Sequence, residues 1–570
     1  MLGAVAPQSV PSGTASDSGP GDEPGSSPGK RAWRPRAARE TVVVLFFAGL
    51  SVLATRPLAR DLGNSTLYGA DPAIYVWMVN WLSGHLLQPS QLFGGNLFHP
   101  TPHAALLSDL AFGTALFAAP LRPVLRDPVL LYNVGLLLTL TFGAWAFYTL
   151  VRESTGSTAA GLLSGTLAAY GSHQLHHLYQ LGLVNIGWLA LFLLALRRTF
   201  ARPSPVNAMA LGLTFALNTL SSAYFAVAAA VMALVWALVH WRAARSAALV
   251  RAHVGAVALS AVLLAPYASA FLWLQETEGV RRSVEVNVDN AFKPSRDLTS
   301  ATYLYRGLLG EEGERLFPGI LTLALAAWAC LRRVAGLSFH AWSVLVLTVL
   351  SLGPQVQVGG GTLRLPYAAV FAVPPFDALM HPYSFAAVAR FVLCILAGLG
   401  FATLVPRGRS WPVPAAAALA LAEVASPGAG VRKVPPGVPD VYRALESVPP
   451  GPVLEVPLES PDALIWAARH GRPVLNGASA LAPVGHDRLQ QWIRKDWVRP
   501  SREGHVPDVD RTRAMRQLLR MPARYVIVRA GAHPELVGLA KGFARSRHFA
   551  RVDTGGGPDR LYRRNDDGRP

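Results

Sequence analysis

The chain has 570 residues, of which 51% are hydrophobic and only 15% are charged. A soluble protein carries roughly a quarter charged residues, so this composition excludes an ordinary soluble enzyme. The formal net charge of +18 does not indicate a nucleic-acid partner, because the arginines stand mostly in short clusters beside apolar runs and form no basic groove with interleaved aromatic residues.

Residues 1–39 are predicted to be a disordered, basic, cytoplasmic N-terminus, because the sequence there is rich in Gly, Pro and Ser and then in Arg, without apolar periodicity. The apolar run Thr41–Ala59 follows. It lies too far from Met1 to be a cleaved signal peptide, and we interpret it as a signal anchor.

Residues 60–127 contain two predicted helical pieces, Asp71–Leu87 and Ala104–Val124, separated by a Gly/Pro/Asn-rich bend. The second piece is apolar enough to cross a membrane. If it lies in the interface instead, the arginine clusters near 197, 242, 332 and 407 all fall on the cytoplasmic side, as the charge bias of membrane proteins requires. We therefore predict about eleven spans, or twelve if Ala104–Val124 also crosses the membrane. Besides Thr41–Ala59, the predicted spans are about 128–150, 157–173, 181–200, 205–221, 222–241, 250–274, 317–331, 338–353, 385–405 and 411–426.

The predicted fold class is mainly α: a polytopic helical protein of the cell (inner or plasma) membrane with a small C-terminal α/β domain. The transmembrane domain covers residues 40–428, with outer loops at about 60–127, 275–316 and 354–384, and loops gathered on one side of a rigid bundle favour a site there. Residues 429–570 are the expected extracytoplasmic domain, with strands at Val453–Leu458 and Tyr525–Val528 and helices at Val441–Ser447 and Ala514–Leu519.

Asp71 is the first candidate for chemistry. It precedes Pro72 and the aromatic-rich stretch Ile74–Trp81, which contains Tyr75. An Asp before Pro is a preferred helix start, and a capping carboxylate can also face a cleft, so the two interpretations are compatible. Asp109, on the second helical piece, is the second acidic candidate. The alternative interpretation is that it is a solvated residue at the level of the lipid headgroups.

In this layout the chain resembles the GT-C superfamily of membrane glycosyltransferases, in the branch of the protein O-mannosyltransferases and the lipid A aminoarabinose transferase. The resemblance covers residues 40 to 320. It includes an acid before an aromatic helix in the first outer loop, a Pro-containing turn (His99-Pro100-Thr101-Pro102) with an apolar helix after it, and a second large outer loop at Gln275–Leu316. The neighbours of Asp71 are Ala70 and Pro72, whereas many relatives have a second acid there.

The resemblance implies an enzyme that transfers a sugar, with inversion, from a polyprenyl-phosphate donor to an extracytoplasmic glycan, lipid or protein. Asp71 would be the base toward the acceptor hydroxyl, which needs a carboxylate within hydrogen-bond reach. Arg281 and Arg282 are candidates to bind the donor phosphate, with contacts to membrane-lipid headgroups as the alternative.

His173, His176 and His177 have the spacing of one helix face, and we expect them to line the site together with Tyr75, Tyr224 and His381. Because no carboxylate lies near them in the sequence, we predict no metal ligands and no cofactor, with a divalent metal as the open alternative. Two rival functions remain: a transporter or flippase of lipid-linked glycans, which should show internal repeats and ionisable residues in mid-span, and a catalytically inactive assembly protein of the same fold.

Overall fold

The computed structural model describes residues 28–69, 71–280, 315–358, 361–372, 381–405, 412–425, 430–434, 437–458, 460–479 and 481–565. Its contacts divide the chain into two compact units, Met1–Val43 and Val44–Pro570. Residues 1–27 of the predicted disordered N-terminus lie outside the described residues. Helix α1 (Pro28–Ala54) begins before the predicted boundary at 39, because the Arg- and Ala-rich stretch ahead of the apolar run favours a helix.

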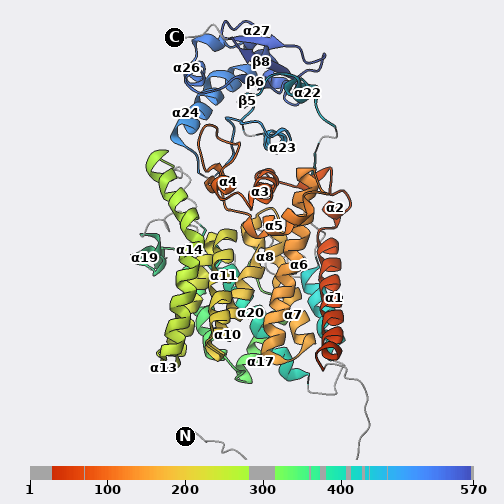
Figure 1. Cartoon of the computed structure of the whole chain (residues 1–570), viewed down its shortest axis with the longest axis vertical. Helices are drawn as coiled ribbons and strands as arrows, with labels where there is room; N and C mark the ends of the chain where they lie inside the picture. The colour runs from red at the N-terminus through yellow and green to blue at the C-terminus, as the bar shows by residue number, and fades with distance from the viewer. Residues whose placement is uncertain are drawn as a thin grey trace, which may run out of the picture. The chain divides into compact units, whose positions relative to one another are not determined.

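The second unit is mainly helical, with the chain running repeatedly along one bundle (Figure 1). Across both units, the described part of the chain has five segments that are long and apolar enough to cross a membrane: Ala37–Ala54 of α1, α6 (Pro128–Thr155), Leu181–Ala201, α14 (Ala247–Thr277) and α20 (Tyr383–Leu404). The count of eleven spans stays a prediction, since the other predicted runs form shorter helices: α7 (Thr158–Tyr170), α11 (Pro205–Ser221), α12 (Ala223–Val239), α17 (Ile320–Leu331), α18 (Leu337–Ser351) and α21 (Pro412–Val424).

Helix α6 shows how local sequence sets the helix ends. The Asp127 carboxylate accepts hydrogen bonds from the amides of Val129 and Leu130, at 2.9 and 3.1 Å, and Pro128 occupies the first helical position. Gly156 ends the helix at φ +74°, a backbone conformation that glycine adopts without strain. The polar residues that flank the apolar run therefore define the helix.

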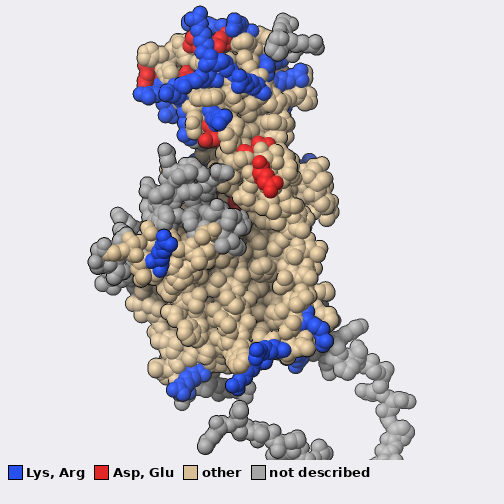
Figure 2. Space-filling view, turned by 90° about the vertical axis from the view of Figure 1, so that its left-hand side faces the viewer, with Lys and Arg blue, Asp and Glu red and all other residues tan. Residues whose placement is uncertain are grey.

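One end of the bundle collects the arginine clusters. Phe200 of α10 (Ile186–Ala201) packs against Trp236 of α12 and His253 of α14, with ring centroids 5.6 and 5.4 Å apart, and Arg198 pairs with Glu153 of α6. Arg333 and His240 line one cavity, so the clusters near 197, 242 and 332 share one end, and the cluster near 407 lies outside the described residues. Figure 2 shows a broad uncharged belt between this end and the C-terminal region.

The first outer loop differs from prediction in its second half. Helix α3 (Asp71–His85) forms as expected, followed by the single turn α4 (Pro89–Leu92). The predicted apolar helix Ala104–Val124 is wrong as one element: it forms η1 (Ala104–Leu107), α5 (Phe112–Ala118) and η2 (Ala119–Leu121), each too short to cross a bilayer. The break is possible because its backbone finds other partners: the Ser479 hydroxyl donates to the Leu107 carbonyl, and the Gly113 amide donates to Ser221 Oγ.

The C-terminal α/β region, residues 430–565, contains a four-stranded sheet in the order β5-β6-β8-β7. Strand β5 (Val453–Val456) is parallel to β6 (Tyr525–Val528), and β8 (Arg560–Arg564) is antiparallel to β6 and to β7 (Phe549–Val552). Both predicted strands coincide with β5 and β6. The helices of this region are α22 (Asp440–Ser447), α23 (Pro461–His470), α24 (Val484–Ile493), α25 (Arg499–Arg502), α26 (Arg513–Arg520) and α27 (Val537–Ala544), so the two predicted helices are α22 and α26.

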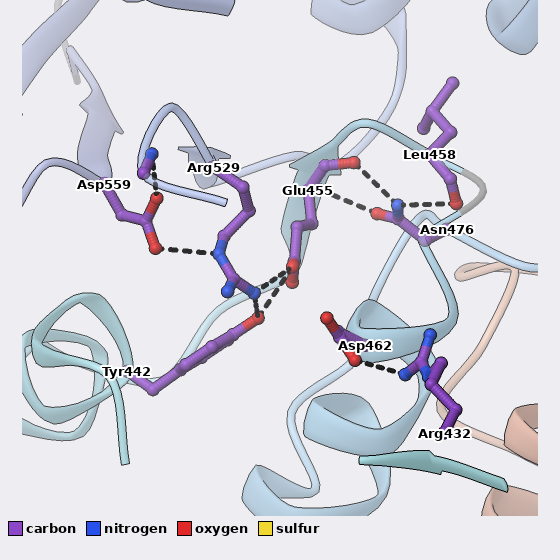
Figure 3. A network of polar contacts seen from close by, with 9 residues as sticks. Arg432, Tyr442, Glu455, Leu458, Asp462, Asn476, Arg529 and Asp559 are labelled. Atoms are coloured by element: carbon purple, nitrogen blue, oxygen red, sulfur yellow. Dashed lines mark hydrogen bonds and ion pairs between the residues drawn. The ribbon is translucent and has the colours of Figure 1, made fainter. Parts of the chain in front are cut away.

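A buried ionic network joins the ends of the sheet strands to α22 (Figure 3). The Arg529 guanidinium, which follows β6, donates to Asp559 at 2.8 Å, to Glu455 of β5 at 3.1 Å and to the Tyr442 hydroxyl of α22 at 2.8 Å. Burial raises the pKa of Glu455, and the adjacent guanidinium opposes that rise. Buried charges of this kind are stable only when each is paired, so loss of one member would leave its partners buried without their ion pair.

We expect the two ends of the bundle to lie on opposite sides of the membrane, which cysteine labelling tests. In a background with the exposed Cys330 replaced by Ser, Ser90→Cys and Ser447→Cys place thiols at exposed positions in the first loop and the C-terminal region, and Ala243→Cys places one at the arginine end. An impermeant maleimide added to intact cells should label the first two. Labelling of Ala243→Cys before permeabilisation would contradict the topology.

Candidate functional site

The predicted first outer loop, residues 60–127, is joined to the C-terminal region by main-chain pairing. The Val474 amide donates to the Asn96 carbonyl at 2.6 Å, and the amides of Phe98 and His99 donate to the carbonyls of Asn476 and Val474, each at 2.9 Å. Val474 also forms a parallel bridge to Val453 of β5. Residues 96–99 therefore pair with residues 474–476, which in turn contact β5, and so continue the C-terminal sheet beyond β5.

The side chain of Asn96 adds three hydrogen bonds to this junction. Its amide group donates to the carbonyls of Ala467 and Arg472, both at 2.9 Å, and its Oδ1 accepts from the Trp77 indole of α3 at 2.6 Å. Asn96 is buried, so all three bonds are shielded from water and hold α3 against α23. Gly477 leaves room for the Phe98 ring, which lies where a Cβ atom would stand.

Two further contacts close the junction. Strand β1 (Ser65–Leu67), directly after the first span, pairs antiparallel with β4 (Val431–Lys433), where the C-terminal region begins. At the start of α6, the Asp127 carboxylate accepts from Arg469 of α23 at 2.9 Å. The C-terminal region is thus attached to the first loop at several separate places.

A cavity of about 480 Å³ adjoins this junction, since Ala478, Ser479 and Leu481, just after the paired segment, line it. It brings together five of the predicted site residues: Asp71, Tyr75, Asp109, Tyr224 and His381. They come from three parts of the chain that are far apart in the sequence: the predicted outer loops 60–127 and 354–384, and the start of the predicted run 222–241. Residues that the sequence did not single out complete the wall, among them Gln180, Gly182, Tyr267, Phe271, Tyr383, Ser384, Ala478, Ser479 and Leu481.

Asp71 lies in the first turn of α3 and faces this cavity. Its Oδ2 accepts a hydrogen bond from the Gln180 amide at 3.3 Å. Burial raises the pKa of the Asp71 carboxyl, and the bond from Gln180 opposes that rise. A carboxylate that is less hydrated and more basic than usual is suited to accept a proton.

Asp109 lies in the irregular stretch between η1 and α5, and not on a helix as predicted. Its carboxylate sits beside Gly182, close to where a Cβ atom of that residue would stand. Tyr75 lines the same cavity, and burial, then Asp109, then Asp71 raise the pKa of its hydroxyl. The break in the predicted helix is therefore what brings a second carboxylate into the cavity.

The three histidines lie one layer behind the cavity wall and are not among the residues that line it. The His173 and His177 rings are 4.2 Å apart, and His177 stacks against Tyr179 and against Tyr383, at 5.9 and 6.1 Å. Tyr383 itself lines the cavity. His173 and His177 are buried, and both rings approach Tyr383, so they pack behind the cavity wall.

Arg281 and Arg282, predicted to bind phosphate, lie outside the described residues, four and five positions after the end of α14. Within the described part of the chain, the cavity lining includes no Lys or Arg, and no three His, Cys, Asp or Glu residues are grouped as metal ligands. Two carboxylates suit Mg²⁺ only when a substrate phosphate and water supply further oxygens.

No protein-family model matches the chain, and no curated protein matches it by sequence. Among solved structures it is similar to the oligosaccharyltransferase of Archaeoglobus fulgidus in the apo form, at a TM-score of 0.47 and 13% identity over 87% of this chain and 70% of the other. It is also similar to the archaeal oligosaccharyltransferase AglB from the same organism in complex with an inhibitory peptide and a dolichol-phosphate, at a TM-score of 0.46 and 12% identity over 94% and 75%.

The junction predicts the effect of Asn96→Ala. The substitution leaves two buried carbonyls and one indole without their partner, at a cost of about 1–3 kcal/mol for each buried polar group left unpaired. The C-terminal region of the purified full chain should become more sensitive to protease at temperatures where the bundle stays folded. Asn64→Ala, which removes an exposed amide in the same loop, should change little; equal sensitivity of the two variants would contradict the junction.

Proposed function

We propose that this protein is a membrane glycosyltransferase that transfers a sugar from a polyprenyl-phosphate donor to an acceptor hydroxyl outside the cytoplasm. The observation that supports it is the convergence of Asp71 and Asp109 on one cavity at the end of the bundle away from the arginine clusters. Asp71 is the proposed base, because burial makes its carboxylate more basic and Gln180 orients it.

In the proposed reaction, the acceptor oxygen attacks the anomeric carbon of the donor while its proton passes to the Asp71 carboxylate. The new glycosidic bond forms as the bond from the anomeric carbon to the phosphate oxygen breaks, so the configuration inverts. Polyprenyl phosphate leaves as an anion and needs cationic donors more than an acid. We assign that role to Arg281 and Arg282, which follow α14 in the sequence.

Helix α14 supports a donor that arrives from the lipid phase. Tyr267 and Phe271 line the cavity, whereas Val257, Val262 and Leu272 of the same helix are more than half exposed. A span with apolar side chains exposed along its length faces lipid. One helix therefore contacts both the cavity and the expected bilayer, so a polyprenyl chain can lie against α14 with its phosphate near the carboxylates.

A transporter should place ionisable residues where a substrate passes. Arg390 of α20 is such a residue, and it was not recognised in the sequence. It is buried, and its guanidinium donates to the carbonyls of Leu167 and Ala168 at 3.2 and 3.1 Å, at the C-terminal end of α7. A cation at a helix C-terminus stabilises the helix dipole, so Arg390 has a structural role and the enzyme is the better-supported proposal.

The role of Asp71 predicts that Asp71→Asn loses about 10²- to 10⁴-fold in turnover, since an amide cannot take the proton. Donor binding should change little, because the proton comes from the acceptor, and helix α3 should remain, because Asn starts a helix as well as Asp does. Sugar transfer by detergent-solubilised protein measures this. Asp61→Asn, outside the cavity in the same loop, is the matched control. Near-normal transfer by Asp71→Asn would move the role of base to Asp109.

The hydrogen bond from Gln180 predicts a shift in pH dependence. A base acts only when deprotonated, so kcat/KM falls as pH drops through the pKa of Asp71. The Gln180 bond lowers this pKa, and Gln180→Leu should therefore move the acid limb of the profile to higher pH, with rates that approach wild type again above the limb. A loss of equal size at every pH would show that Gln180 only shapes the cavity.

A further inference from the structure

A second cavity, of about 630 Å³, lies in the C-terminal region. Its floor is apolar and consists of Pro457, Leu458, Ile493 and Val498. Its rim carries one amide, Gln491, and four cations. They are Arg494, Lys495, Arg499 and Arg502, all exposed. Figure 2 shows Lys and Arg spread over this part of the protein.

A π-helical turn, η4 (Arg494–Val498), produces this arrangement between α24 and α25. It turns the buried Trp497 toward the interior, where the indole donates to Thr512 Oγ1 at 2.9 Å. Such turns widen a helix and occur frequently at functional sites. The cations before and after Trp497 remain on the outer side, around the apolar floor.

Nearby acidic side chains only partly neutralise the four cations on the rim of the second cavity. Asp496, the acid within the turn, is directed to α26, where it accepts from the amides of Arg513 and Ala514 at 3.0 and 3.3 Å. Of the four rim cations, Arg499 pairs with Glu503 at 3.1 Å and Arg502 approaches Glu535 at 3.9 Å. These pairs are exposed and therefore weak, so an anionic ligand can compete for the same guanidinium groups.

Helix α24 connects the two cavities. Leu481, in the wall of the first cavity, precedes the helix, and Ile493, in the floor of the second, is its last residue. Ten helical residues rise about 15 Å. The helix starts next to the end of α14, where the Val484 amide meets the Glu278 carbonyl at 3.5 Å, so the second cavity lies a helix length further from the end of that span.

We propose that the second cavity is a subsite for an acidic saccharide, a distal part of the acceptor chain that carries carboxylate or phosphate groups. Guanidinium groups bind such anions in bidentate fashion, and the apolar floor suits the C–H face of a sugar ring. The separation from α14 disfavours a lipid headgroup. The role as acceptor subsite rests on the proposed function, whereas binding of the saccharide does not.

Binding to the full-length, detergent-solubilised protein tests the subsite, with trigalacturonate as the acidic probe and a neutral galactose trimer of the same length for comparison. Wild type should bind the acidic trimer tighter, and Lys495→Gln/Arg499→Gln should lose about tenfold or more in affinity for each charged hydrogen bond removed. Arg511→Gln/Arg551→Gln removes the same charge from exposed positions of this region outside the cavity and should stay within about twofold.

Three outcomes would overturn the subsite: equal binding of both trimers, an equal loss in the control variant, or tighter binding of a triglutamate peptide than of the acidic trimer. Asp71→Asn should keep full affinity for trigalacturonate. If the wild-type protein transfers no sugar but binds the acidic trimer as described, the proposed function fails and the subsite stands. If sugar is transferred but the acidic trimer does not bind, the subsite fails alone.

Discussion

The backbone pairing between residues 96–99 and 474–476 is the constraint on which the candidate site depends. It fixes the first outer loop to the C-terminal sheet, and buried Asn96 connects the same junction to α3 and α23. Asp71 begins α3, and Ala478 to Leu481 follow the paired segment, so both walls of the cavity are positioned by one set of hydrogen bonds. Without this pairing, Asp71 would lie in a loop open to water and would lose the burial that raises its pKa.

Much of this arrangement could be predicted from the sequence, because the arginine clusters indicate which ends of the helices lie on the same side of the bundle. The arginine clusters predicted that the polar segments share one side, and five of the residues predicted for a site line one cavity: Asp71, Tyr75, Asp109, Tyr224 and His381. Strands β5 and β6 were predictable as well, since short runs of buried β-branched residues between turn residues are characteristic of strands. These features depend on local composition alone.

Other features depend on contacts between distant segments and leave no local pattern. Gln180 is one polar residue in an apolar neighbourhood, and only the fold brings its amide to Asp71. The stretch Ala104–Val124 has the composition of one helix, yet hydrogen bonds from Ser479 and to Ser221 stabilise a break in it. Likewise the histidine spacing correctly indicated one shared face, but it could not show that the face packs against Tyr383.

The order of the paired segments along the chain has a consequence for biosynthesis. Strand β1 and residues 96–99 leave the ribosome early, but their partners, Val431–Lys433 and residues 474–476, come more than three hundred residues later. At roughly 5–20 residues per second, these edges wait about 18–76 s for their partners. The cavity can therefore be completed only after both partner segments have been synthesised, and until then β1 and residues 96–99 lack their backbone partners.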